Sequence, residues 1–481
     1  MRGRGLILAA PSSGSGKTLV TAGLLRHLRE RGSRVAAAKA GPDYIDPTFH
    51  AAATGGVSIN LDPWAMRQAT LAGLVSGLES AADIVLCEGV MGLFDGTGPD
   101  GETGSTASLA RLTGWPVVLV VDARHQGASV AALVAGFARH DPALPLAGIV
   151  FNRVAGPRHR ALLEVAIARH LPDIACLGAL PRDRELMLAE RHLGLVPAGE
   201  RASAETVIAR AAMAVAAGLD IDRLVALARC APPFLTLPRR RGRAGWGLEA
   251  DEAGVGDHPV VSDPSPHPNP PPLAGEGTVA PLPPLGQRIA IARDDAFLFA
   301  YPSVLEGWRR LGAELSFFSP LADEIPDTAA DAVYLPGGYP ELHGGRLAAS
   351  GHFAEALQRA ASAGTAIYGE CGGYMALGES LIDGDGRTHR MVGLLPLVTS
   401  FAERRLHLGY RAARLIGAGP LGPKGARFRG HEFHYVTTIA ADAAAPLFAL
   451  ADASGSDLGA SGLRRGSVMG SFIHLIDRAE D

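Results

Sequence analysis

A glycine-rich turn with one lysine stands near the N-terminus, in the sequence LILAAPSSGSGKT of residues 6–18. When such a turn joins a strand to a helix, its backbone N–H groups and the helix N-terminus point at phosphate oxygens. Lys17 would then reach the terminal phosphates, and the Thr18 hydroxyl would bind Mg²⁺. The pattern departs from G-x-x-x-x-G-K-[ST], because Pro11 occupies the first glycine position. A chance turn is the weaker alternative, and we predict that ATP is bound by Ser13, Gly14, Ser15, Gly16, Lys17 and Thr18.

Acidic residues follow two further predicted strands. Asp43 and Asp46 lie in KAGPDYIDPTFH after the strand expected at 35–38, and Glu88 and Asp95 lie in CEGVMGLFDG around the end of the next. In an open α/β sheet, ligands bind at the carboxyl ends of the strands. One acid there is often only a cap or turn residue, but four beside a phosphate loop favour a role in Mg²⁺ or substrate binding. The predicted metal ligands are Thr18, Asp43 and Glu88.

Asn152 closes another predicted strand, at 148–151. Its side-chain amide could read an adenine edge, which would add it to the ATP site. A simple turn asparagine is an equally good interpretation.

A second reactive group lies far along the chain, where AIYGECGGYM carries Cys371 in the pattern G-x-C-x-G. This is the nucleophile-elbow pattern with cysteine in place of serine, and its small flanking residues permit the strained backbone that exposes the side chain. A helix N-terminus beneath the sulfur would favour the thiolate. A buried structural cysteine is the alternative, and the frame of the motif argues against it.

A nucleophilic cysteine also needs a base and an oxyanion hole. The terminal GSFIHL places His474 just after the last predicted strand, and a Cys–His pair is sufficient to generate the nucleophile. In PGGYPE, Gly337 and Gly338 follow a predicted strand, and with the Gly372 amide they would stabilise the oxyanion.

The segment GHEFHY at 430–435 is the other dense polar cluster. Its H-E-x-H spacing is not the helical zinc spacing H-E-x-x-H, and the interleaved aromatic residues indicate a strand. A contact with substrate or with the other domain is the better interpretation, and the individual roles of His431, Glu432 and His434 stay open.

The order of apolar segments indicates two α/β domains in the 481 residues. Residues 1–235 alternate short aliphatic runs with Ala/Leu-rich stretches of helical period, which predicts a doubly wound parallel sheet with helices on both faces. Residues 236–286 are rich in proline and would form a linker or insertion. The alternation resumes over residues 287–481.

Composition excludes several other classes of protein. A formal charge of −4 gives no basic footprint for nucleic acid, and four scattered cysteines argue against disulfides and thiolate metal sites. No uninterrupted apolar run is long enough to cross a membrane, and the N-terminal apolar run is too short for a signal peptide. We therefore expect a cytoplasmic protein without nucleic acid or membrane partners, and the oligomeric state stays open.

Together, the two sites suggest ATP-dependent amide formation. One domain would release ammonia from glutamine through a Cys371 thioester, and the other would activate a carboxylate as an acyl phosphate. A carboxylate oxygen is a poor leaving group, so phosphorylation must precede the attack by ammonia. Mg²⁺ and Lys17 would stabilise the charge on the transferred phosphoryl group.

The same segments resemble a known family. PSSGSGKT, KAGPDYIDPTFH, CEGVMGLFDG, PGGYPE, GECGGYM, GHEFHY and GSFIHL, in this order, are similar to the cobyrinic (hydrogenobyrinic) acid a,c-diamide synthases of cobalamin biosynthesis. The resemblance implies a dethiobiotin synthetase-like domain, a class I glutaminase-like domain, and amidation of the a and c acetates of a corrinoid acid with ATP and glutamine. It implies that Cys371 is the nucleophile and that His474 activates it. It assigns to the synthetase site Asp43, Tyr44, Ile45, Asp46, Glu88 and Asp95.

One departure from wider glutaminases concerns the residue that would orient the histidine. Triad enzymes carry H-x-E, whereas Ile476 occupies that position here, which fits the dyad enzymes that this family resembles. The alternatives are cobyric acid synthase, nickel-sirohydrochlorin a,c-diamide synthase, and a non-enzymatic P-loop protein of the partitioning type. Whether the macrocycle carries cobalt is left open.

Overall fold

The structure is a computed structural model, and it describes residues 2–98, 100–183, 185–186, 190–191, 194–195, 204–232, 280–440 and 444–480. Most of the proline-rich segment predicted at 236–286 lies outside the described residues. Its last part, from Ala280 onward, packs on the C-terminal domain, where Leu282 and Leu285 are buried. No helix in the described part of the chain is long and apolar enough to span a bilayer.

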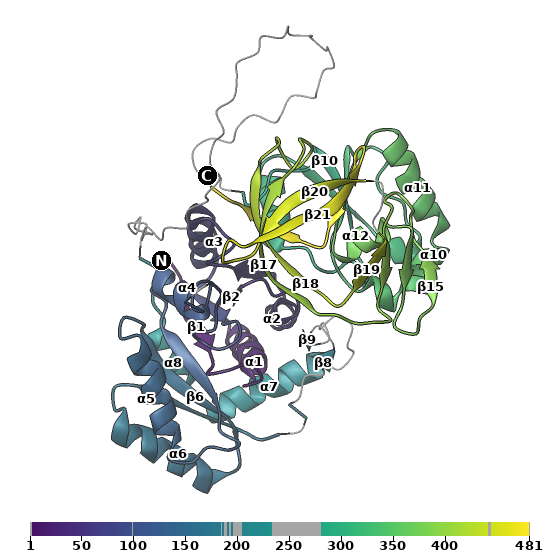
Figure 1. Cartoon of the computed structure of the whole chain (residues 1–481). Coiled ribbons are helices and arrows are strands. Elements are labelled where there is room, and N and C mark those ends of the chain that lie inside the picture. The colour runs from purple at the N-terminus through teal and green to yellow at the C-terminus, as the bar shows by residue number, and fades with distance from the viewer. Residues whose placement is uncertain are drawn as a thin grey trace, which may run out of the picture.

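The N-terminal domain contains a seven-stranded parallel sheet in the order β3-β2-β4-β1-β5-β6-β7 (Figure 1). Aliphatic residues fill both faces of its central strands, as expected for a sheet that is covered on both sides. Its strands are β1 (Arg4–Ala9), β2 (Val35–Ala40), β3 (Ser58–Leu61), β4 (Ile84–Glu88), β5 (Val117–Asp122), β6 (Leu146–Val154) and β7 (Ala175–Pro181).

Helices cover the two faces in separate groups. Leu6 and Leu8 of β1 belong to the core under one group, whereas Ile7 and Ala9 belong to the core under the other. The first group is α1 (Lys17–Glu30), α2 (Asp46–Thr54), α7 (Ala204–Gly218) and α8 (Ile221–Leu227). The second is α3 (Gln68–Ala81), α4 (Thr106–Thr113), α5 (Val130–His140) and α6 (Pro157–His170). This arrangement confirms the predicted doubly wound domain.

The C-terminal domain contains a ten-stranded mixed sheet whose first half is parallel, in the order β11-β10-β12-β13-β22. The alternation expected over residues 287–481 corresponds to these five strands: β10 (Arg288–Ala292), β11 (Glu314–Phe318), β12 (Ala332–Leu335), β13 (Ala366–Glu370) and β22 (Val468–Ser471). The antiparallel half, of which only the GHEFHY part of β18 was expected from sequence, consists of β17 (His407–Leu415), β18 (Arg427–His434), β20 (Ala445–Ala451), β21 (Asp457–Arg465) and β23 (His474–Arg478).

Helices and a small sheet complete this domain. They include α9 (Pro302–Arg310), α10 (Gly344–Ala349), α11 (Gly351–Ser362) and α12 (Gly372–Ala376). The small sheet contains β14 (Ser380–Ile382), β15 (Thr388–Arg390), β16 (Val398–Ser400) and β19 (Thr437–Ala440).

The two domains meet through a polar and aromatic interface. Figure 1 shows α2 and α3 facing the long antiparallel strands β17 and β18. Trp64, which follows β3, stacks on Tyr410 of β17 with ring centroids 4.5 Å apart. Arg67 forms a 2.7 Å ion pair with Asp477, whose side chain is fully buried. The domains are therefore held in a defined relative orientation.

Candidate active sites

The phosphate loop connects β1 to α1, and its conformation requires glycine. Gly14 and Gly16 have φ values of 75° and 87°, a region that other residues rarely adopt. The Asn152 amide donates a 2.9 Å hydrogen bond to the Ser15 carbonyl. A Cβ added to Gly16 would lie 2.3 Å from that amide nitrogen. Asn152 therefore supports the loop from β6, and its adenine-reading role stays a prediction.

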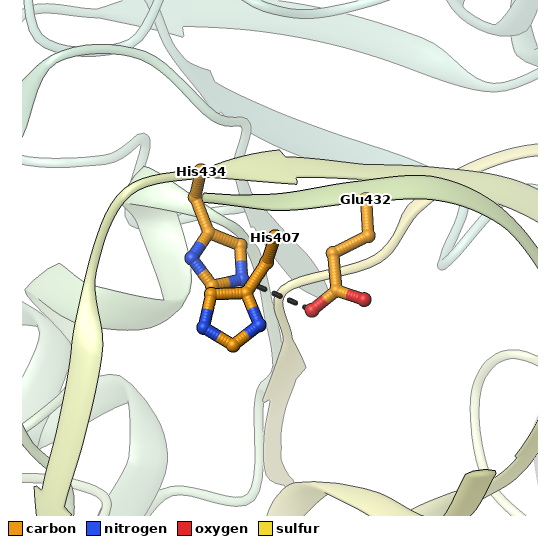
Figure 2. Close-up of side chains that lie close together, drawn as sticks. All are labelled: His407, Glu432 and His434. Carbon is orange, nitrogen blue, oxygen red and sulfur yellow. Dashed lines mark hydrogen bonds and ion pairs between the residues drawn. The ribbon is translucent and has the colours of Figure 1, made fainter. Parts of the chain in front are cut away.

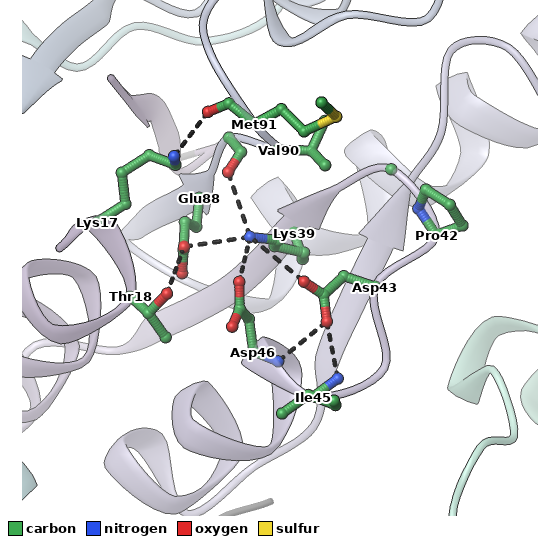
Figure 3. Close-up of polar contacts among 12 residues, drawn as sticks. Lys17, Thr18, Lys39, Pro42, Asp43, Ile45, Asp46, Glu88, Val90 and Met91 are labelled. Carbon is green, nitrogen blue, oxygen red and sulfur yellow. Dashed lines mark hydrogen bonds and ion pairs between the residues drawn. The ribbon is translucent and has the colours of Figure 1, made fainter. Parts of the chain in front are cut away.

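The two side chains expected to handle phosphate and metal lie at the start of α1 (Figure 3). The Lys17 ammonium donates to the Met91 carbonyl at 2.6 Å, and burial followed by the charge of Lys39 lowers its pKa. The Thr18 hydroxyl donates to Glu88 Oε1 at 2.8 Å. Thr18 and Glu88 are thus brought together as the sequence predicted.

Lys39, at the end of β2, organises the acids, and sequence reasoning did not single it out. Its ammonium lies 2.5 Å from Asp46, 3.1 Å from Glu88 and 3.8 Å from Asp43. Although burial opposes it, these carboxylates raise the pKa of Lys39, which stays charged. A signal was available, since Lys17, Lys39 and Lys424 are the only lysines among the 45 basic residues.

A second buried partner of Glu88 was also missed. His50 of α2 lies with its Nε2 2.6 Å from Glu88 Oε2. Burial raises the pKa of Glu88, but Lys39 and His50 outweigh it and hold that pKa well below its usual range. The Glu88 carboxylate is therefore an ionised group that can bind a cation.

A cavity of about 610 Å³ joins these groups into one site. Of the predicted residues, its lining includes Ser13, Gly14, Gly16, Lys17, Thr18, Asp43, Ile45, Asp46, Glu88 and Asn152. Ser15 binds the Ser12 carbonyl within the loop, Asp95 accepts the Gly92 N–H at 2.8 Å, and Tyr44 turns toward the other domain. The lining also contains residues that sequence reasoning missed, at the end of β7 and on α7: Leu180, Pro181, Arg182, Ala211, Ala214 and Val215.

The donors around Thr18 fit a hard divalent cation. Thr18, Glu88, Asp43 and Asp46 offer hydroxyl and carboxylate oxygens beside the phosphate loop, which are the ligands that Mg²⁺ prefers.

Cys371 stands at the tight turn between β13 and α12, with a φ of 46°. The glycines around it permit close backbone approach: a Cβ on Gly373 would lie 1.9 Å from the Leu335 carbonyl oxygen, and one on Gly372 would lie 2.9 Å from the Gly338 nitrogen. The amides of Gly338 and Gly372 are therefore neighbours, as an oxyanion hole requires.

The base and the nucleophile meet at Gly337. A Cβ added there would lie 2.3 Å from His474 Cε1 and 3.3 Å from Cys371 Cβ. The structure thus brings together Cys371, His474, Gly337, Gly338 and Gly372, from strands β12, β13 and β23 and the adjoining turns.

Burial dominates the electrostatics of this pair. Burial, with a smaller effect from Glu341, raises the pKa of the Cys371 thiol. Burial and the neighbouring His431 and His434 lower the pKa of His474 to about 3. The Gly372 N–H at the start of α12 lowers the pKa of Cys371, which is the direction expected of a helix N-terminus, but burial outweighs this effect. Both pKa shifts favour the neutral forms, a thiol and an uncharged imidazole.

Glu370 is the acid nearest to the histidine, but it does not orient it by a hydrogen bond. Its Oε2 lies 3.9 Å from His474 Nδ1. The carboxyl group instead accepts hydrogen bonds from Tyr334, Tyr368 and the Leu475 N–H. Burial raises its pKa to about 7.

The GHEFHY segment contains the end of β18, in agreement with the strand expected there. His431 lies opposite His474 in the register of β18 and β23. On the same strand, Glu432 and His434 approach His407 of β17, with ligand-type atoms within 4.8 Å of one another (Figure 2).

Within the described ranges, this is the one group of three or more His, Cys, Asp or Glu side chains whose ligand-type atoms all lie within 4.8 Å of one another. However, the Glu432 carboxylate already has two partners. It forms a 2.7 Å ion pair with Arg411 and accepts a 3.0 Å hydrogen bond from His434. Because Glu432 is shared between these two partners, we interpret the cluster as a polar network beside the glutaminase centre.

Comparisons with known proteins agree with both sites. Residues 6–196 match the CobQ/CobB/MinD/ParA nucleotide binding domain, and residues 288–481 match the CobB/CobQ-like glutamine amidotransferase domain. Hydrogenobyrinate a,c-diamide synthase from Brucella suis biovar 1 is 49% identical over 98% of each chain. Those from Rhizobium meliloti and Rhodobacter capsulatus are 48% and 49% identical, over 99% and 98% of this chain and 100% and 98% of theirs. The chain belongs to the hydrogenobyrinate a,c-diamide synthase family.

Family membership confirms the α/β architecture with a nucleotide-binding domain followed by a glutamine amidotransferase domain. It also confirms a glutamine-dependent ligase that forms amide bonds in cobalamin biosynthesis. The non-enzymatic partitioning-type alternative is thereby set aside.

Proposed function

We propose that this chain converts the a and c acetate carboxylates of hydrogenobyrinate into amides, with ATP as the activating substrate and glutamine as the nitrogen donor. Three observations support the proposal: the names of the relatives that match nearly the whole chain, the phosphate loop with its acids, and the cysteine–histidine pair.

In the glutaminase half, Cys371 Sγ attacks the side-chain amide carbon of glutamine while His474 accepts the thiol proton. The N–H groups of Gly338 and Gly372 stabilise the oxyanion that develops. The tetrahedral intermediate collapses to a thioester, and His474 returns the proton to the departing ammonia. Water then hydrolyses the thioester, which releases glutamate and regenerates the thiol.

In the synthetase half, a corrin carboxylate oxygen attacks the γ-phosphorus of ATP and ADP leaves, which gives an acyl phosphate. Lys17 stabilises the charge on the transferred group, and Lys39 keeps Asp46 and Glu88 fixed. When bound, Mg²⁺ would be held by Thr18, Asp43 and Glu88 and would neutralise phosphate charge. Ammonia attacks the acyl carbon, inorganic phosphate leaves, and the amide remains.

The single observation that carries this scheme is the position of residues 41–46. This segment bears Asp43 and Asp46, which line the nucleotide cavity. The same segment bears Tyr44, whose ring lies 5.0 Å from that of His474. One short segment therefore borders the site that releases ammonia and the site that consumes it.

The test is a product assay with purified full-length protein, ATP, Mg²⁺ and glutamine. Hydrogenobyrinic acid, its cobalt counterpart cobyrinic acid and nickel-sirohydrochlorin are supplied in parallel, and amides, ADP and glutamate are measured. We expect successive mono- and diamide from hydrogenobyrinic acid, with ADP matching amide, and no amide from Lys17→Ala. Amidation of nickel-sirohydrochlorin in preference to the corrin acids would contradict the proposal.

A further inference from the structure

His474 lacks the usual orienting partner of a catalytic histidine. Its ring is buried, and its Nδ1 has no hydrogen-bond partner among the described residues. The nearest acid, Glu370, lies 3.9 Å away, and its oxygens accept hydrogen bonds from other groups. In a catalytic histidine, a hydrogen bond from Nδ1 to an acceptor normally fixes the tautomer and the orientation of the ring. Something else must hold this imidazole.

Ring contacts surround the imidazole instead. On one side lies the backbone of Gly337, so close that an added Cβ would be 2.3 Å from His474 Cε1. Tyr44 of the N-terminal domain packs against the ring with a centroid distance of 5.0 Å and an interplanar angle of 48°. Phe299 approaches it at 6.5 Å. The histidine is confined by packing, and one of its neighbours belongs to the other domain.

Tyr44 is itself held firmly. Its ring stacks on Tyr301 at 4.4 Å and on Phe299 at 5.1 Å. The Tyr301 hydroxyl donates to the Pro42 carbonyl, and the Phe299 N–H donates to the Gly337 carbonyl at 2.9 Å. The aromatic group therefore connects the segment that carries Tyr44 to the strand end that carries Gly337.

The segment around Tyr44 also forms part of the synthetase site. Asp43 Oδ1 accepts the backbone N–H groups of Ile45 and Asp46, which closes the turn on both sides of Tyr44. Asp43 and Asp46 line the nucleotide cavity and pair with Lys39. The same turn therefore carries two carboxylates of the nucleotide cavity and the ring that contacts His474.

We propose that Tyr44 is a positioning residue for His474, so that a synthetase-domain side chain sets the ring orientation on which glutamine hydrolysis depends. This inference rests on the proposed function, because it assumes that Cys371 and His474 hydrolyse glutamine. It assigns Tyr44 to the first half-reaction in addition to the synthetase site that the family resemblance gave it. The aromatic ring provides the contact, and the hydroxyl is not required for it.

The experiment compares Tyr44→Phe, Tyr44→Leu and Tyr44→Ala in the full-length protein. The measurements are kcat and KM for glutamine hydrolysis without corrin acid, and the rate at which a diazoketone analogue of glutamine alkylates Cys371. Tyr410→Ala is the matched control, because it removes an interdomain tyrosine that stacks on Trp64 and meets His431 edge-on but does not stack on His474.

We expect Tyr44→Ala and Tyr44→Leu to lower kcat and the alkylation rate by about tenfold or more with little change in KM, since a small misplacement of a catalytic group has that effect. Tyr44→Phe should restore most of the loss, and Tyr410→Ala should retain hydrolysis. Tyr44→Leu keeps apolar bulk, so it serves as the test if Tyr44→Ala does not fold.

Normal hydrolysis by Tyr44→Leu or Tyr44→Ala would overturn the inference and leave Tyr44 in the synthetase site alone. An equal loss in Tyr410→Ala would also overturn it, because the effect would then be general loosening of the interface. Failure of the proposed function is distinguishable, because in that case the unmodified protein would form no amide from any corrin acid.

Discussion

At the scale of single residues, the chemistry of the glutaminase half depends on two groups whose pKa values move in opposite directions. Burial raises the pKa of the Cys371 thiol and, with His431 and His434, lowers that of His474 to about 3. Both pKa shifts favour the neutral forms, so we expect the thiol to transfer its proton to the imidazole as it attacks. An ordinary histidine would instead become protonated, and useless as a base, below about pH 6.5.

The resulting prediction concerns the acid side of the pH profile. We expect kcat/KM for glutamine hydrolysis to stay level from pH 6.5 to about pH 5, where an unshifted histidine would cause a fall of about tenfold. Glu370, whose pKa is raised to about 7, is mostly protonated throughout this window, so Glu370→Gln should show the same level profile. Initial rates of glutamate release in buffers of constant ionic strength provide the measurement. A decline with a midpoint near 6.5 would contradict the lowered pKa of His474.

Much of both candidate sites could be predicted from residue types, and the gaps have physical reasons. Local patterns, such as GSGKT and G-x-C-x-G, can be recognised because the functional groups and the turn that positions them lie within one short segment. The roles of Lys39 and His50 were not predicted, because they depend on contacts with Glu88, which is 49 and 38 residues away, respectively. The effect of burial on Cys371 also could not be read from its motif, because it depends on everything packed around the sulfur.

At the scale of elements, the cysteine elbow depends on how closely α12 approaches β12. Gly373 of α12 lies so near β12 that an added Cβ would be 1.9 Å from the Leu335 carbonyl oxygen. Backbone cannot move aside as a flexible side chain can, so α12 would have to shift together with Cys371 at its start.

Gly373→Ala should therefore lower both stability and glutamine hydrolysis. We expect a loss of about 1–3 kcal/mol, typical of overpacking, together with a severe loss of hydrolysis. Gly351→Ala is the matched control, since an added Cβ at the start of α11 meets nothing within 4 Å. Thermal denaturation and glutamate release are to be compared for both variants. If Gly373→Ala retains the stability and rate of the unmodified protein, the close packing does not position the elbow.

The buried parallel strands were predictable, because short continuous aliphatic runs such as those of β4 and β5 are typical of strands buried on both faces. The antiparallel half of the second sheet was not. Strand β21 is largely exposed and carries glycines at 459 and 462, and β17 mixes arginines with alanines. Their pairing is fixed by partners elsewhere in the chain rather than by local pattern. The GHEFHY segment was the exception, because its alternation indicated a strand directly.

At the scale of the whole molecule, the domain interface combines stacked rings with one nearly buried ion pair. Arg67 donates to Asp477 through its side chain and its backbone N–H, and it also donates to the Ala280 carbonyl. Asp477 is fully buried and Arg67 is only 19% exposed, so removing the arginine side chain would leave a buried carboxylate without its ion-pair partner.

Arg67→Ala should accordingly destabilise the protein by about 3 kcal/mol, the lower end of the range for breaking a buried pair. Arg34→Ala removes an ion pair of similar length to Asp83, but both of its members are exposed, and the unfolding midpoint should hardly change. Denaturant unfolding of both variants, with limited proteolysis between the domains, makes the comparison. Equal midpoints for the two variants would show that the interface does not depend on Arg67.

Cys371→Ala shows whether glutamine hydrolysis and carboxylate activation occur in separate halves of one enzyme. Amide formation from hydrogenobyrinic acid and ATP is measured with either glutamine or a high concentration of ammonium salt as the nitrogen donor. We expect no amide from glutamine and near-normal amide from ammonia, because Cys371 lies in the glutaminase half alone. Loss of ammonia-dependent amidation in a folded Cys371→Ala protein, or its retention with glutamine, would contradict it.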